Sequence, residues 1–66
     1  MNNSPIFKTA VLEEKQTGFL QFLHNIGISD EHINYVPRGN YQIYFINLIN
    51  FPEVRKKLVE HQTDFL

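Results

Sequence analysis

The feature that most constrains this chain is the uncharged apolar segment from Asn40 to Asn50. Its eleven residues, NYQIYFINLIN, include four aliphatic and three aromatic side chains and no charged one. Such a density of β-branched and aromatic residues favours a strand, which we place at residues 41–48. A chain of 66 residues buries only about 60% of the surface that it exposes when unfolded. Few of its residues are therefore available to cover such a strand.

Both faces of this predicted strand are mainly apolar. Alternate side chains of a strand point to opposite faces, which divides the segment into two sets: Tyr41, Ile43, Phe45 and Asn47; and Gln42, Tyr44, Ile46 and Leu48. A strand with one solvated face would alternate apolar and polar residues, whereas this pattern is typical of a strand covered on both sides. We therefore expect one helix of the chain over each face.

The residues before Gly27 predict a helix. Phe19, Phe22, Leu23 and Ile26 recur at steps of three and four, which lines one face of a helix. With Ser4 as cap and Pro5 at the first position, residues 5–26 are interpreted as one helix, weakened at Gly18. The alternative is a strand at Ile6–Leu12, a turn, and a helix from Thr17.

The rest of the chain predicts a turn, a hairpin and a second helix. Ser29 caps a short helix at residues 30–34, PRGN is a turn, and residues 32–36 are the candidate to pair with the strand. Asn50 and Glu53 approximate a capping box for an amphipathic helix at about residues 51–63. The apolar seam of this helix consists of Phe51, Val54, Leu58, His61 and Phe65. It is interpreted as docking on the chain's own sheet, with a short coiled coil as the alternative.

Together these elements predict one α+β domain over residues 1–66, with residues 1–4 flexible. The chain has no cysteine, so disulfides cannot supplement its small core, and association with another chain is the remaining route. Unpaired strand edges are templates for pairing. We therefore expect a homodimer that extends the sheet across a two-fold axis, or a monomer that offers this surface to a target protein. The candidate interface residues are Tyr41, Tyr44, Phe45, Val54, Leu58, His61 and Phe65.

The sequence offers little for catalysis, metals or cofactors, and we expect none of the three. Its three histidines lack the spacing of a helical zinc pair. Glu13-Glu14 and Asp30-Glu31 are adjacent pairs, which diverge on a helix instead of converging on a substrate. No signal-like start or long apolar run is present, so we expect a cytoplasmic protein without membrane association.

Nucleic-acid binding is a weaker alternative. The net charge is −1, and Asp30 and Glu31 would repel phosphates at the start of a helix that could otherwise read DNA. The candidate phosphate contacts are Arg38, Arg55, Lys56 and Lys57. A second alternative is a nucleotide or small-molecule sponge, in which Tyr35, Arg38 and Tyr41 would stack and bind phosphate between two subunits.

The leading interpretation is a small regulatory or inhibitory protein that acts by protein–protein contact. The frequent Asn, Ile, Phe, Tyr and Lys have AT-rich codons, which suggests a low-GC bacterium or a phage or mobile element of such a host. This part of the interpretation is an association with proteins of similar size and composition, not a deduction from chemistry.

Overall fold

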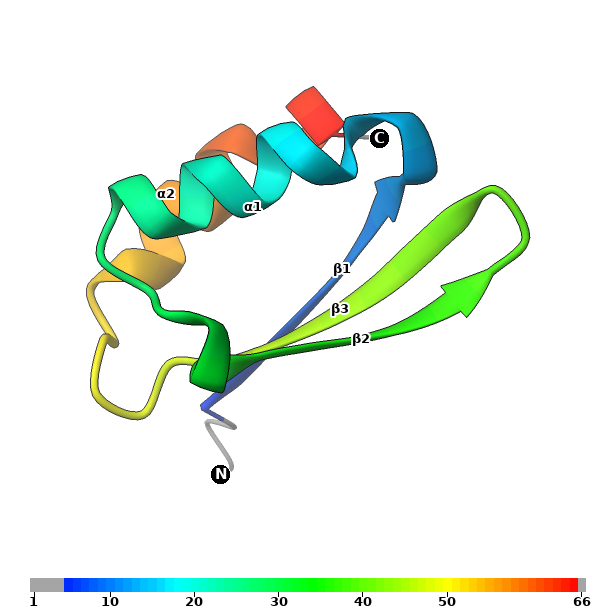
Figure 1. The fold of residues 1–66 in the computed structure, drawn as a ribbon. Helices are drawn as coiled ribbons and strands as arrows, with labels where there is room; N and C mark the ends of the chain where they lie inside the picture. Colours follow the sequence, from blue (N-terminus) through cyan, green and yellow to red (C-terminus); the bar gives the residue numbers. More distant parts are fainter. Residues whose placement is uncertain (1–4, 66) are drawn as a thin grey trace.

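The chain folds into a three-stranded antiparallel sheet with two helices on one side of it (Figure 1). The computed structural model describes residues 5–65, so the predicted flexibility of residues 1–4 and the predicted cap at Ser4 lie outside the described residues. The elements follow the order β1 (Ile6–Leu12), η1 (Glu13–Lys15), α1 (Gln16–Asn25), η2 (Asp30–His32), β2 (Ile33–Arg38), β3 (Tyr41–Asn47), α2 (Val54–His61) and η3 (Gln62–Phe65). The predicted α+β layout is confirmed.

The prediction of one helix over residues 5–26 is wrong, and its alternative is the correct one. Residues 6–12 form β1, which pairs along its whole length with β3, from Ile6 opposite Asn47 to Leu12 opposite Tyr41. The β-branched Ile6, Thr9 and Val11 suit this strand. Long-range pairing with β3 satisfies the inward backbone groups of this segment, and this outweighs the local helical spacing of Phe7 and Val11.

The α1 helix ends as predicted, at Gly27. Gly27 has a φ of 96°, a left-handed conformation that residues with a Cβ seldom adopt. The Gly27 N–H donates to the His24 carbonyl at 3.0 Å, and the Ile28 N–H donates to the Leu23 carbonyl at 3.0 Å. This pair of bonds defines a Schellman motif, and it turns the chain so that Ile28 is buried beside Leu23 in the core.

The predicted hairpin is present, and β3 is the central strand. β2 and β3 are joined through Gly39 and Asn40. Gly39 has a φ of 61°, and no residue other than glycine has a positive φ in the described part of the chain. A glycine at the first position of a two-residue loop is typical of a type II′ turn. The sheet order β1-β3-β2 leaves β1 and β2 as edge strands.

The C-terminal helix begins later than predicted. α2 starts at Val54, with Glu53 as its N-cap and no side-chain cap, so the predicted capping box of Asn50 and Glu53 does not form. Asn47 instead accepts a hydrogen bond from the Ile49 N–H at 2.9 Å, which turns the chain out of β3. The seam docks on the chain's own sheet: Val54 and Leu58 are buried, and Phe51 and Phe65 pack against the core.

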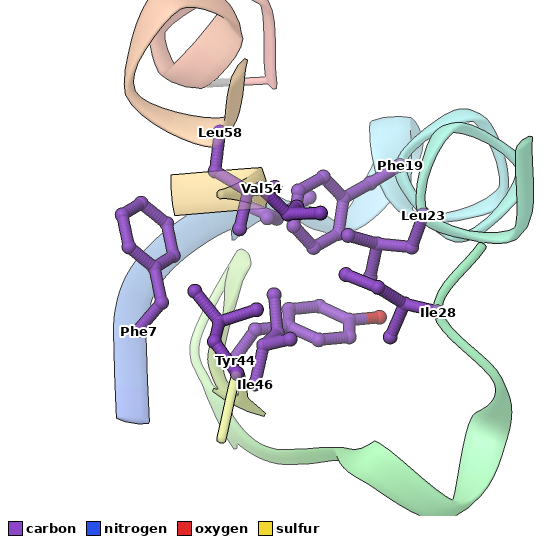
Figure 2. Packing of buried hydrophobic residues seen from close by; sticks show 10 residues of the cluster. Phe7, Phe19, Leu23, Ile28, Tyr44, Ile46, Val54 and Leu58 are labelled. Carbon is purple, nitrogen blue, oxygen red and sulfur yellow. The ribbon is translucent and has the colours of Figure 1, made fainter. Parts of the chain in front are cut away.

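The core lies between one face of the sheet and both helices. Tyr44 and Ile46 rise from β3 toward Phe19 and Leu23 of α1 and toward α2 (Figure 2). The prediction that the helices would cover β3 on both sides is therefore wrong. Both helices lie on the face of Gln42, Tyr44 and Ile46 (Figure 1). The apolar side chains of the other face are covered by no helix or strand of the described chain.

Candidate functional site

The side of the sheet away from the helices is the candidate functional site, and we call it the open face. Three of its apolar residues are exposed: Ile6 at 38%, Tyr41 at 39% and Val36 at 42%. Leu12, Ile43 and Phe45 are half-buried by their neighbours on the same face. By strand alternation and register, the open face consists of Ile6, Lys8, Ala10, Leu12, Asn34, Val36, Arg38, Tyr41, Ile43, Phe45 and Asn47.

The only charges on the open face are positive. Lys8 comes from β1 and Arg38 from β2, and no Asp or Glu belongs to the face as defined. The Lys8 Nζ lies 5.9 Å from the centre of the Phe45 ring, within the range of a cation–π contact. The face therefore combines an apolar centre with two cations.

The structure divides the predicted interface residues into surface and core residues. Tyr41 and Phe45 lie on the open face of the central strand, four residues apart along the chain. Tyr44, Val54 and Leu58 are buried in the core, so they have no surface to offer a partner of the folded chain.

His61 and Phe65 lie on the helical side of the molecule. His61 is exposed, and its Nδ1 is 3.1 Å from the Asp64 carboxylate. Its ring also lies 5.2 Å from that of Phe22. The Phe65 ring packs 5.0 Å from Phe19. Neither residue belongs to the open face.

The four predicted phosphate-contact residues do not form one patch. Arg38 is on the open face, whereas Lys56 and Lys57 are exposed on α2, on the opposite side of the sheet. The Arg55 guanidinium lies 5.7 Å from the centre of the Phe7 ring. The suggested set of Tyr35, Arg38 and Tyr41 is also split within one chain, because Tyr35 belongs to the helical face and stacks on Tyr44 with ring centres 5.1 Å apart.

Two buried polar atoms lie on the helical face of β3. The Gln42 Oε1 and the Tyr44 hydroxyl are enclosed without a hydrogen-bond partner. Burial raises the pKa of Tyr44, an effect that the nearby Gln16 side chain partly opposes. Burial is the larger of the two effects, and the Gln16 side chain does not lie in hydrogen-bond geometry to the hydroxyl. These atoms lie under the helices and not on the open face.

The described residues contain no arrangement suited to metal binding. No group of three or more histidine and acidic side chains is close enough to hold an ion between residues 5 and 65. A shallow pocket at the hairpin end of the sheet is lined by Leu12, Glu13, Glu14 and Asn40. Its two carboxylates would disfavour a phosphate. In the same part of the chain, no helix is long and apolar enough to cross a bilayer.

Sequence reasoning missed most of the open face. The preferred prediction places Ile6, Lys8, Ala10 and Leu12 in a helix and only its alternative places them in a strand. Val36 is predicted in an ordinary hairpin strand. The sequence feature that could have identified the strand is the segment IFKTAVL. In the structure its alternate residues Phe7, Thr9 and Val11 are buried, and the residues between them are not. Recognising it required knowing that β3 pairs with this segment.

Comparisons with protein-family models, with curated protein sequences and with solved structures give no match to this chain. Its function is therefore inferred from the open face itself.

Proposed function

We propose that this chain is a small regulatory or inhibitory interaction protein that binds a target protein through the open face. The observation that supports this proposal is a three-stranded sheet with both helices on one side and an apolar, aromatic-containing second side. Contiguous exposed apolar surface on a small protein commonly marks an interaction site. Aromatic residues such as Tyr41 and Phe45 are enriched at the centres of interfaces.

The charges on the open face favour a target different from the chain itself. Two copies packed face to face would bring Lys8 and Arg38 of each copy together without a carboxylate on either side. Like charges placed together in an interface are costly. The target we propose has an apolar surface with Asp or Glu side chains at its rim, positioned to meet these two cations.

One observation favours a second candidate, a single-stranded nucleic acid. Tyr41 and Phe45 on the central strand, with Lys8 and Arg38 nearby, resemble the stacking and phosphate contacts that some sheets use. Two features favour protein contact over it. Aliphatic side chains of Ile6, Leu12, Val36 and Ile43 fill the space around the rings, and the net charge of −1 supplies no attraction for phosphates.

Affinity capture from a lysate of the source organism tests the proposal, using matched variants. Val36→Asp introduces an acid on the open face, whereas Val59→Asp introduces one at an exposed site on α2. Arg38→Glu has Lys57→Glu as its counterpart on the helical side. We expect the two open-face variants to lose the captured protein and the two α2 variants to retain it. With the purified target, the open-face variants should bind at least about tenfold more weakly.

Circular dichroism of all four variants first confirms that they fold. Equal capture by Val36→Asp and Val59→Asp would contradict the proposal. Capture that disappears after nuclease treatment would instead assign the face to nucleic acid.

A further inference from the structure

The outer backbone edge of β1 at Lys8 and Ala10 is a second candidate surface, distinct from the side chains of the open face. The Glu13 N–H donates to the Asn40 carbonyl at 2.8 Å, and the Leu48 N–H donates to the Pro5 carbonyl at 2.7 Å. These bonds fix which residues of the antiparallel ladder face β3, because hydrogen-bonded pairs alternate with non-bonded ones. Phe7, Thr9 and Val11 direct their backbone groups to β3. Lys8 and Ala10 direct theirs outward.

The other edge of the sheet is protected at its hairpin end. The same alternation makes Val36 and Arg38 face β3, so Pro37 directs its nitrogen to the outside. Proline has no N–H to donate, and proline on an edge strand is a common protection against pairing. β1 has no proline. Its edge is therefore the less protected of the two against extension of the sheet.

The sequence of β1 is self-complementary about Thr9. Suppose that β1 pairs antiparallel with the β1 of a second copy, around a two-fold axis at Thr9. Ile6 would then lie opposite Leu12, and Phe7 opposite Val11. Lys8 would lie opposite Ala10. Apart from Thr9 opposite Thr9, every pair joins apolar residues or sets the single charge against alanine. Apolar and Thr–Thr pairs directly opposite each other stabilise antiparallel strands.

The hydrogen-bond pattern agrees with this register. Lys8 and Ala10, on either side of Thr9, direct N–H and C=O groups outward, and the register places Lys8 of one copy opposite Ala10 of the other. Each such pair exchanges two N–H···O bonds. A register that mismatched outward and inward residues would form none of them.

One exposed apolar side chain lies on the side of α2 that faces β1. The Arg55 guanidinium lies 5.7 Å from the centre of the Phe7 ring. The Gln62 Nε2 donates a hydrogen bond to the Thr9 hydroxyl at 3.1 Å. Val59 lies between Arg55 and Gln62 on the same side of α2, by helical spacing. The Val59 side chain is 56% exposed, although it lies on the same side of the helix as Arg55 and Gln62, which contact β1.

We propose that two copies of this chain associate through their β1 edges, in antiparallel register centred on Thr9, to form one six-stranded sheet. The two open faces then lie on the same side of the joined sheet. This inference uses the backbone edge of β1, whereas the proposed target contact uses side chains of the open face. It is tested with the purified chain alone, so either proposal can fail without the other.

Charge substitutions at Ala10 test both the association and its register. In the proposed register, Ala10→Glu sets two carboxylates opposite the two Lys8 side chains, whereas Ala10→Lys sets two ammonium groups there. Sedimentation equilibrium should show a dimer for the parent chain, about threefold to tenfold tighter for Ala10→Glu and weaker by a similar factor for Ala10→Lys. Ala10 is only half-buried on the open face, so both variants can fold.

Two further measurements complete the test. Ala10→Pro removes an outward N–H, which an edge strand tolerates, and should yield a folded monomer. Hydrogen exchange at the Lys8 and Ala10 amides should slow as the concentration of the parent chain rises. A parent chain and an Ala10→Glu variant that both stay monomeric at millimolar concentration would overturn the proposal. Weakening by both charge variants would overturn the register, because it would place Ala10 opposite Ala10.

Discussion

Tyr44 shows how a single residue can serve the core at a local cost. Its ring is fully buried, stacks on Tyr35, and meets Phe19 edge-on with ring centres 5.0 Å apart. Its hydroxyl is buried without a hydrogen-bond partner. The aromatic contacts stabilise the fold, whereas the enclosed hydroxyl loses its hydration without compensation.

Replacing Tyr44 with phenylalanine should therefore stabilise the protein. The variant keeps the ring and removes the unpartnered oxygen, and we expect the free energy of unfolding in urea to rise by about 1 kcal/mol. Tyr35→Phe is the control, because Tyr35 is about half-exposed and its hydroxyl is not among the buried unpaired atoms. Its substitution should change stability by less than about 0.5 kcal/mol. A Tyr44→Phe variant that is less stable than the parent would show that the hydroxyl is bonded in solution.

The same variant has a signature in alkali. Burial raises the pKa of Tyr44 above the ordinary tyrosine value of 10.0, so the unfolded state loses its phenolic proton first as the pH increases. The stability associated with Tyr44 is thus fully present below about pH 10 and decreases as the pH rises above it. Tyr44→Phe should lessen this decrease, as measured by urea unfolding at pH 8 and at about pH 10.5.

At the scale of the element, the predictable parts were those decided locally. The end of α1 at Gly27, the turn before β3 and the two faces of β3 all follow from neighbouring residues. The identity of β1 does not, because Phe7 and Val11 fit a helical stripe as well as a strand face. The pairing of β1 with β3, which is distant in the sequence, decided between them.

The two glycines at Gly18 and Gly27 should respond oppositely to alanine. Gly27 has a positive φ within the Schellman motif, so Gly27→Ala should cost about 1–2 kcal/mol of unfolding free energy. Gly18 lies within α1, and no neighbouring element comes within 4 Å of the position that a Cβ would take there. Gly18→Ala should therefore add roughly 0.5–1 kcal/mol. Thermal and urea unfolding of the two variants measure this, and similar effects of the two substitutions would contradict the assigned end of α1.

At the scale of the whole molecule, the sequence placed apolar side chains on both faces of β3. The predicted positions of the helices were wrong, because the residues of α1 and α2 do not determine which side of a sheet each helix will cover. That choice depends on the chain path: β1, α1 and β2 return the chain to the same sheet, and α2 follows on the same side (Figure 1). The candidate site was found only in part, through Tyr41, Phe45 and Arg38, for the same reason.

One pair of substitutions tests the one-sided covering of the sheet most directly. Ile43 and Ile46 lie on the same central strand, Ile43 on the open face and Ile46 fully buried under the helices. Threonine keeps the β-branched shape at both sites but adds a hydroxyl. Measured by urea unfolding at a concentration where the chain is monomeric, Ile46→Thr should cost about 3 kcal/mol and Ile43→Thr less than about 1 kcal/mol. Equal losses at the two positions would mean that both faces are covered and would contradict the account.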